Sequence, residues 1–349
     1  MDPNAGKKEL RNKLGRDAAI AALEAEAFQR KTTSFYRYVE ISDPNAMRDL
    51  LFSEWSKMDV FGRVYIAKEG INAQISIPEP QWSNFIETLH SHKEFDLMQQ
   101  KNAVEDDGKS FFKLIVKVKK QIVADGLDFG EYDISNVGNH LNAAQWNEAM
   151  EKGATIVDMR NHYESEIGHF EGAICPQSET FKEELPEVLI DLKDKKGDQI
   201  LLYCTGGIRC EKASAYLKHH GFNDVNQLHG GIIDYARQIE KDEGLDNKFI
   251  GKNFVFDERL GERISDEVIS NCHQCGEPSD DHVNCQNKTC NLLFIQCKKC
   301  ATQHSGCCSK RCIDYSLLPE EEQVARRKGE KSDSRFHNHQ KRDLSQGLK

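Results

Sequence analysis

Tyr203-Cys204-Thr205-Gly206-Gly207-Ile208-Arg209-Cys210 joins a strand pattern to a helix pattern. The run before it, from Gln199 to Tyr203, is short and apolar, as in a buried β-strand. From Glu211 to His220, apolar residues recur at helical spacing until Gly221 ends the helix. We therefore expect this loop at the N-terminus of a helix, directly after a buried strand.

Cys204 is a candidate nucleophile because of its place in this loop. Gly206 and Gly207 allow a tight turn in which several backbone N–H groups converge, and the helix dipole favours negative charge there. Such a position lowers the pKa of a cysteine from its free value of about 8.5, and Arg209 adds a positive charge that could hold an anionic substrate. The alternative is a packed structural cysteine, but the arginine five residues later favours a reactive cysteine.

The residues around this loop resemble a rhodanese domain, in which a cysteine, followed five residues later by arginine, carries a persulfide sulfur. Further matching segments occur in the family's order at residues 155–164, 168–173, 221–222 and 228–232. Such segments spread over roughly 100 residues are more specific than the loop alone. The resemblance predicts a rhodanese-like α/β domain over residues 130–245.

The composition is that of a soluble multidomain chain. Its 349 residues are enough for two or three domains, with 38% hydrophobic and 30% charged residues. The start shows no secretory signal pattern, and no apolar run approaches the roughly 18 residues of a membrane span. Twelve cysteines without an export signal are typical of a reducing compartment. We expect a cytoplasmic protein without a membrane partner.

The net charge of −10 is unevenly distributed. Residues 121–245 hold 11 Lys and Arg against 23 Asp and Glu, so the rest of the chain is close to balance. A local basic surface for nucleic acid therefore remains compatible with the acidic total.

The N-terminal region predicts a helical arm over residues 1–31 and then a small α+β domain over 32–122. Its strand and helix signals follow the order βαββαβ, with a last strand from Phe111 to Lys119, which suggests a ferredoxin-like (acylphosphatase-like) unit. This makes the chain a mixture of α+β and α/β domains.

The last strand of that unit carries apolar residues on one face and lysines on the other. The apolar set is Leu114, Val116 and Val118, and the basic set is Lys113, Lys117 and Lys119. The lysines could track a phosphate backbone, with Phe35, Tyr36 and Tyr38 as stacking surfaces. An ordinary solvated sheet face is the alternative.

Nine of the twelve cysteines lie in residues 272–312. The two C-x2-C pairs, Cys272 with Cys275 and Cys297 with Cys300, can wrap one tetrahedral zinc ion. A second ion could take Cys285, Cys290, Cys307 or Cys308, and Cys312. A reduced or redox-active thiol cluster is the alternative, but so short a segment could hardly build a core without a metal. We expect a connecting segment over 246–271 and a disordered charged tail over 319–349.

As a whole, the order of these parts resembles the TrhO family of oxygen-dependent tRNA uridine hydroxylases. The resemblance covers roughly residues 30–312 and rests on blocks of sequence that a plain sulfurtransferase does not need. These blocks are residues 61–74, 157–164, 204–216 and 249–259, together with the cysteine-rich segment.

The resemblance implies hydroxylation of the wobble uridine at carbon 5, with molecular oxygen as co-substrate and a tRNA anticodon loop as partner. It implies Cys204 as the active cysteine, Arg209 as an anion binder, and Asp158 and Arg160 as positions that support the loop. On physical grounds we add Cys210, which could resolve an oxidised or persulfide adduct on Cys204 as a disulfide. No flavin or nicotinamide site is evident, and the electron donor is unknown.

Other readings of the Cys204 loop stay open at this point. A sulfurtransferase would carry a persulfide on Cys204 and need no oxygen. A phosphatase is disfavoured because the five-residue interval suits one sulfur atom, and a non-catalytic zinc adaptor would not need the intact loop. Within the hydroxylase reading, Cys204 could add to carbon 6 of the uracil, or a persulfide could take part in oxygen activation.

Overall fold

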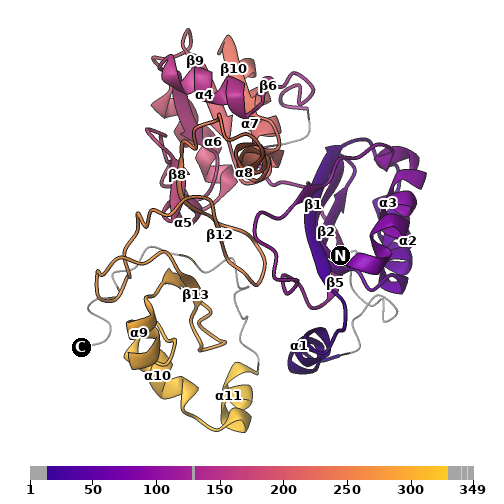
Figure 1. Ribbon diagram of the computed structural model, residues 1–349, viewed down its shortest axis with the longest axis vertical. Helices are drawn as coiled ribbons and strands as arrows, with labels where there is room; N and C mark the ends of the chain where they lie inside the picture. The colour runs from indigo at the N-terminus through magenta and orange to yellow at the C-terminus, as the bar shows by residue number, and fades with distance from the viewer. Residues whose placement is uncertain (1–13, 128–129, 329–338, 340–343, 345–349) are drawn as a thin grey trace.

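The computed structural model describes residues 14–127, 130–328, 339 and 344, which form an N-terminal, a central and a C-terminal part (Figure 1). Residues 1–13, the first part of the expected helical arm, lie outside the described residues. The rest of the arm contains helix α1, Arg16–Glu24. Strand β1 begins at residue 30, two residues before the expected domain start.

The N-terminal part is a five-stranded sheet with the strand order β4-β1-β3-β2-β5. Its strands are β1 (Arg30–Tyr38), β2 (Phe61–Ala67), β3 (Gly70–Pro78), β4 (Lys101–Asn102) and β5 (Leu114–Val118). Its helices are α2 (Pro44–Lys57) and α3 (Trp82–Ser91), with 3-10 turns η2 (Glu79–Gln81) and η3 (Lys93–Phe95). Figure 1 shows α2 and α3 together on one side of this sheet, away from the rest of the molecule.

The strand that closes the βαββαβ unit differs from the expected one. The two-residue strand β4 pairs with β1 and takes the fourth position of the ferredoxin-like sheet. The expected closing strand is β5, which lies at the opposite edge and pairs in parallel with β2. Two residues are too few for a strand signal to emerge from residue preferences, so the sequence predicted the longer strand instead.

The core of the N-terminal part lies between the sheet and its helices. Phe35 of β1, Trp55 of α2 and Phe85 of α3 are buried, with ring centroids 6.2 Å apart for Phe35 and Trp55 and 5.2 Å for Trp55 and Phe85. Phe35 is therefore a core residue and offers no stacking surface to a ligand. Because successive strand residues face opposite sides, Tyr36 and Tyr38 lie on the helix-free face.

The central part is a parallel four-stranded sheet with helices on both faces, which agrees with the α/β class expected for it. The strand order is β6-β10-β9-β7. The strands are β6 (Asn139–Leu141), β7 (Thr155–Asp158), β9 (Gln199–Tyr203) and β10 (Asp224–Leu228). The helices are α4 (Ala143–Glu151), α5 (His162–Ser165), α6 (Phe181–Asp191), α7 (Ile208–His219) and α8 (Gly231–Lys241). The Cys204 loop thus joins buried β9 to α7, where we expected it.

The C-terminal part docks on the central part through a small sheet. Strand β11 (Phe249–Asn253) pairs with β8 (Gly168–Phe170) of the central part and with β12 (Glu262–Arg263). The cysteine-rich segment follows, and its elements are β13 (His282–Asn284), β14 (Leu293–Ile295), α9 (Lys298–Gln303) and α10 (Lys310–Ser316).

Part of the expected disordered tail is helical. Helix α11 spans Glu320–Arg327, with three glutamates in its first turn and two arginines in its last, an arrangement that suits the helix dipole. Glu322 and Arg326 form an i,i+4 ion pair at 2.6 Å. Residues 329–338, 340–343 and 345–349 of this segment lie outside the described residues.

Among the helices of the described residues, none combines the length and the apolar character that crossing a membrane requires.

Candidate active site at the Cys204 loop

The Cys204 loop turns so that a backbone N–H points at the sulfur. Gly207 has φ of +96°, which favours glycine, and its N–H donates a hydrogen bond to Cys204 Sγ at 3.1 Å. Cys204 is fully buried. A Cβ atom on Gly207 would lie 2.9 Å from Tyr36 Oη, so a side chain at 207 would displace the tyrosine.

The surroundings of Cys204 favour the thiolate. Burial raises the pKa of Cys204, but the hydrogen bond from the Cys210 thiol, the charge of Arg209 and backbone N–H groups lower that pKa to about 5. Burial and the neighbouring Cys204 raise the pKa of Cys210 well above its usual value. These opposite pKa shifts favour a thiolate at Cys204 beside a protonated thiol at Cys210.

Arg209 is engaged by a carboxylate inside the protein. Its guanidinium forms two parallel hydrogen bonds with Glu164, Nη1 to Oε1 at 2.6 Å and Nη2 to Oε2 at 2.9 Å. Both side chains are buried, with exposed fractions of 10% for Arg209 and 0% for Glu164. The expected role of Arg209 as a substrate anion binder conflicts with this pairing, because the guanidinium faces Glu164 of α5. Sequence reasoning missed Glu164 as the partner, although it stands in the matching segment 155–164.

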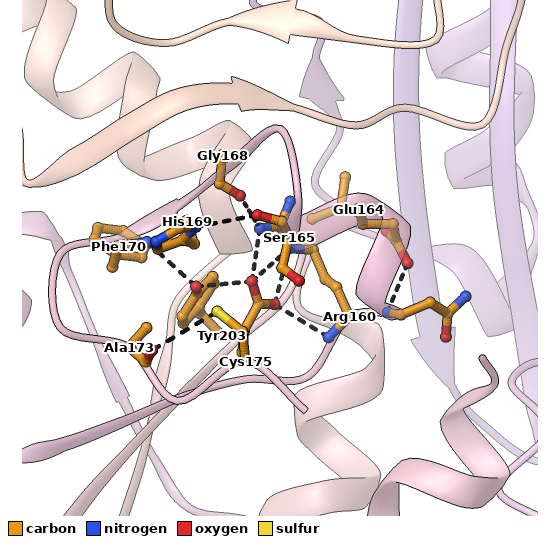
Figure 2. A network of polar contacts seen from close by, with 12 residues as sticks. Arg160, Glu164, Ser165, Gly168, His169, Phe170, Ala173, Cys175 and Tyr203 are labelled. Carbon is orange, nitrogen blue, oxygen red and sulfur yellow. Dashed lines mark hydrogen bonds and ion pairs between the residues drawn. The ribbon is translucent and has the colours of Figure 1, made fainter. Parts of the chain in front are cut away.

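Asp158 and Arg160 form a buried network with Tyr203, the residue before Cys204. Figure 2 shows Arg160 and Tyr203 of this network. Arg160 binds the Asp158 carboxylate at 2.6–3.1 Å and donates to the Gly168 carbonyl at 2.6 Å. The Tyr203 hydroxyl donates to Asp158 at 2.8 Å and accepts from the Phe170 N–H at 3.2 Å. Because Tyr203 directly precedes Cys204, this network fixes the base of the loop. Asp158 and Arg160 therefore lie where residues that position the Cys204 loop are expected.

Two tyrosines of the N-terminal part contact helix α7. The Tyr36 hydroxyl donates to Glu211 Oε1 at 2.9 Å, and the Tyr38 hydroxyl donates to the Ile208 carbonyl at 3.2 Å. Glu211 also accepts hydrogen bonds from His140 and Gln227. The two rings were candidates for stacking on bases, but their hydroxyls hold the N-terminal sheet against the first turn of α7.

Lys101 of β4 reaches the loop itself, and sequence reasoning missed it. Its Nζ donates to the Gly206 carbonyl at 2.7 Å and lies 4.2 Å from the centroid of the Tyr36 ring. Burial lowers the pKa of Lys101 to about 8, against the opposing effect of the negative Cys204. A lone lysine in a two-residue strand gives no sequence signal for such a role.

A buried lysine on α7 ties the helix to segments outside the central sheet. Lys212 is 1% exposed, and its Nζ lies 3.1 Å from Glu69 and 3.1 Å from Asp125. It also donates to the Val123 carbonyl at 2.9 Å. Glu69 belongs to the β2–β3 turn, and Asp125 and Val123 belong to the connection before the central part. The helix that follows Cys204 is thereby anchored to the N-terminal part.

The predicted lysine face lies on the same side of the sheet as Tyr36 but at the other edge. The register of the strands puts Tyr36 beside Asn72, Asn72 beside Tyr65, and Tyr65 beside Lys117. Four strands at about 4.8 Å spacing put roughly 14 Å between the ends of this row. Lys113 and Lys119 flank β5, and Lys119 Nζ lies 5.1 Å from the Tyr65 ring centroid.

The cysteine-rich segment gathers eight cysteines into two sets of four. In each set the sulfur atoms lie within 4.8 Å of one another. The first set is Cys272, Cys275, Cys297 and Cys300, and the second is Cys285, Cys290, Cys308 and Cys312. Four convergent sulfurs are the donor set that tetrahedral zinc prefers.

Cys307 is outside both sets, which corrects its place among the expected ligands. Its thiol points to Ser316 Oγ at 3.7 Å, and its carbonyl accepts from Gln274 at 2.9 Å. The neighbouring Cys308 instead donates its N–H to Cys285 at 3.5 Å and directs its sulfur to the second set. Adjacent side chains diverge here, and sequence spacing could not decide which of the two would converge on the others.

Three family models match consecutive parts of the chain. They are the UPF0176 acylphosphatase like domain at residues 30–122, the rhodanese-like domain at 142–238 and the rhodanase C-terminal model at 250–313. The expected ferredoxin-like (acylphosphatase-like) and rhodanese-like units are confirmed.

Curated relatives match over nearly the whole chain. A protein of Leptospira interrogans named tRNA uridine(34) hydroxylase is 55% identical over 331 residues, covering 95% of this chain and 90% of the relative. A protein of the same name from Yersinia enterocolitica is 52% identical over 334 residues, covering 95% of each chain. A solution structure of a rhodanese-like domain from Anabaena covers 33% of this chain and 80% of its own at 20% identity. Its TM-score to this chain is 0.26.

Proposed function

The chain belongs to the tRNA uridine(34) hydroxylase family, and we propose that it hydroxylates carbon 5 of the wobble uridine through the Cys204 thiolate. The observation that supports this most is the loop in which Gly207 N–H and the Cys210 thiol both hydrogen-bond to Cys204, with its pKa at about 5. Family membership favours hydroxylation over sulfur transfer from the same loop. The base must leave the anticodon stack to reach the sulfur, which is less costly for an unpaired base.

In the proposed chemistry, Cys204 acts as a nucleophile that activates the uracil ring. The thiolate forms a bond to carbon 6, and the ring electrons make carbon 5 nucleophilic toward an oxygen species. Molecular oxygen supplies the hydroxyl oxygen. Its second atom leaves as water, taking two protons and two electrons from an external two-electron donor. Loss of the carbon 5 proton then expels Cys204 as the thiolate.

Cys210 has two candidate roles: it could resolve oxidised Cys204 as a disulfide, or it could only donate a hydrogen bond to Cys204. Two substitutions separate these roles. Cys210→Ser keeps a hydroxyl donor beside Cys204 but cannot form a disulfide, whereas Cys210→Ala loses both functions. If Cys210 resolves a Cys204 sulfenic acid formed by side oxidation, releasing water and a disulfide that an added thiol reductant reopens, we expect both variants to lose roughly tenfold in multiple turnover with that reductant present, because oxidised Cys204 would accumulate. Non-reduced peptide mass spectrometry of the oxidised wild type should show a Cys204–Cys210 disulfide.

Cys175→Ser is the matched control for the Cys210 variants, since Cys175 is a free cysteine of the same domain. Full turnover by Cys210→Ser, with no Cys204–Cys210 bond in the oxidised wild type, would rule out the resolving role. Loss of turnover in Cys210→Ala alone would leave Cys210 as a hydrogen-bond donor only.

We also propose that the helix-free face of the N-terminal sheet binds the tRNA backbone. The row from Tyr36 to Lys117 runs from the Cys204 loop to the basic edge. We expect Lys117→Glu combined with Lys119→Glu to weaken tRNA binding at least about tenfold and to lower the salt slope by about 2. Filter binding at several salt concentrations measures both quantities.

A control for the lysine variants reverses charges on the other face of the same sheet. Lys57 ends α2 and Lys93 begins η3, so Lys57→Glu with Lys93→Glu makes the same charge change on the helix side. This control should bind tRNA as the wild type does. Equal losses in both double variants would reduce the proposal to a general charge effect, and no loss in either would remove it.

Each cysteine set is proposed to hold one structural zinc ion. The first set is attached to the central part, because His273, next to Cys272, lies 2.9 Å from Glu166 at the end of α5. Zinc would therefore support the segment whose His273 contacts Glu166, without taking part in the reaction. We further propose that the protein acts in the cytoplasm, where tRNA is found and thiols stay reduced.

A further inference from the structure

One peptide bond of the Cys204 loop is held at both of its polar ends. The carbonyl of Gly206 accepts a hydrogen bond from Lys101 Nζ at 2.7 Å. The N–H of Gly207, on the same peptide bond, donates to Cys204 Sγ at 3.1 Å. A trans peptide bond is planar, so its carbonyl and its N–H point in opposite directions. A group that fixes the Gly206 carbonyl therefore also fixes where the Gly207 N–H points.

The charges along this line support one another. An ammonium group on the carbonyl side polarises the peptide bond and makes its N–H a stronger donor. A thiolate on the other side gains from that stronger donor. The sequence of contacts from Lys101 through the peptide bond to Cys204 therefore places positive charge at one end and negative charge at the other.

Lys101 takes its position from the N-terminal sheet. It begins β4 and pairs with Ser34 of β1, and its Nζ lies over the Tyr36 ring at 4.2 Å. The Tyr36 hydroxyl in turn is fixed by Glu211 and lies against Gly207. The loop that holds the sulfur is thus completed by side chains from a different domain.

We propose that Lys101 is a positioning residue of the Cys204 site, which acts through the Gly206–Gly207 peptide bond so that the docked N-terminal domain sets the reactivity of Cys204. This rests on the proposed role of Cys204 as a thiolate. A domain that binds tRNA and also orients the donor to the sulfur would make full reactivity depend on correct docking.

Several other groups act on Cys204, and the test must hold them constant. They are Arg209 and Cys210 on α7, Glu184 on α6 and Tyr36 on β1. Lys101→Met keeps most of the side-chain length and removes only the charge and the donor. Lys196→Met is the matched control, since Lys196 also donates to a carbonyl, that of His220 at 2.7 Å, and lies 5.8 Å from the Phe222 ring.

The experiment measures iodoacetamide alkylation of Cys204 in the full chain from pH 4 to pH 10, quantified by peptide mass spectrometry. In the wild type we expect half-maximal alkylation near pH 5, the pKa of Cys204. Lys101→Met should shift the profile upward by about one unit, lowering the rate at pH 5 several-fold and restoring it above pH 8. Lys101→Arg should stay close to the wild type, and Lys196→Met should be indistinguishable from it.

An unchanged profile in Lys101→Met would overturn the inference, and so would an equal shift in Lys196→Met. Thermal unfolding identifies a variant that fails to fold, and Lys101→Gln then replaces Lys101→Met, with the same shift expected. A wild-type profile that rises only near pH 8.5, the value of a free cysteine, would instead contradict the thiolate in the proposed function.

Discussion

Cys204→Ala is expected to abolish 5-hydroxyuridine at position 34 of tRNA, with a loss of at least about a thousandfold in rate. The proposed chemistry begins with a bond from this sulfur to carbon 6, and all later steps depend on that bond. An alanine side chain cannot form it. The measurement is nucleoside mass spectrometry of tRNA from aerated cells that lack the gene and other hydroxylation routes, complemented with the wild type or the variant.

Cys175→Ala is the control for this experiment because it removes a free thiol from the same domain. Burial, followed by the negative charge of Asp158, raises the pKa of Cys175 to about 12, so its thiol stays protonated. This control should retain the modification. Cys204→Ser, which preserves the size of the buried side chain, should lose it while unfolding at the wild-type temperature. Persistence of 5-hydroxyuridine in both Cys204 variants would rule out a nucleophilic Cys204.

Removing the metal is expected to unfold the cysteine-rich segment while the N-terminal and central parts stay folded. Structural zinc sites contribute roughly 10–16 kcal/mol of apparent binding free energy at neutral pH, far more than so small a core could supply. Elemental analysis of the purified wild type should find about two zinc ions per chain. With a strong chelator, limited proteolysis should cut within residues 272–316 before it cuts elsewhere.

The two sets of cysteines can be told apart by single substitutions. Cys300→Ser removes a ligand of the first set and Cys290→Ser one of the second, and each should lower the zinc content by about one ion per chain. Cys307→Ser is the matched control because Cys307 is buried in the same segment but outside both sets. It should retain two ions. A wild-type chain that is fully folded and free of zinc would falsify the metal proposal.

The sequence was most informative where chemistry depends on neighbouring residues. The buried strand before Cys204, the helix after it and the two-glycine turn all follow from local patterns, and they lie where they were expected. The C-x2-C pairs likewise converge as their spacing suggested. Within the Cys204 loop and within each C-x2-C pair, the residues that act together are only a few positions apart, so the spacing carries most of the local geometry.

Contacts between distant residues could not be predicted in the same way. Lys101 and Gly206 are 105 positions apart, and their contact depends on how β4 pairs with β1 and how two domains dock. The pairing of Arg209 with Glu164 is similar, because a cation five residues after a cysteine gives no sign of which anion it will meet. The sequence therefore indicated Cys204 as a candidate nucleophile, whereas the pairing of Arg209 with a carboxylate of α5 could not be predicted from it.

The two ion pairs of Lys212 bear on whether the rhodanese-like unit could be exchanged between proteins. The rhodanese-like unit contains the ammonium group of Lys212 on α7. Its charge is balanced by Glu69 and Asp125, which both lie outside the central sheet. Cutting the chain before residue 130 would remove both carboxylates and leave this ammonium group without its ion-pair partners. Recombination that transplanted the unit alone would therefore be selected against unless position 212 changed too. The two domains are expected to have been inherited as a pair.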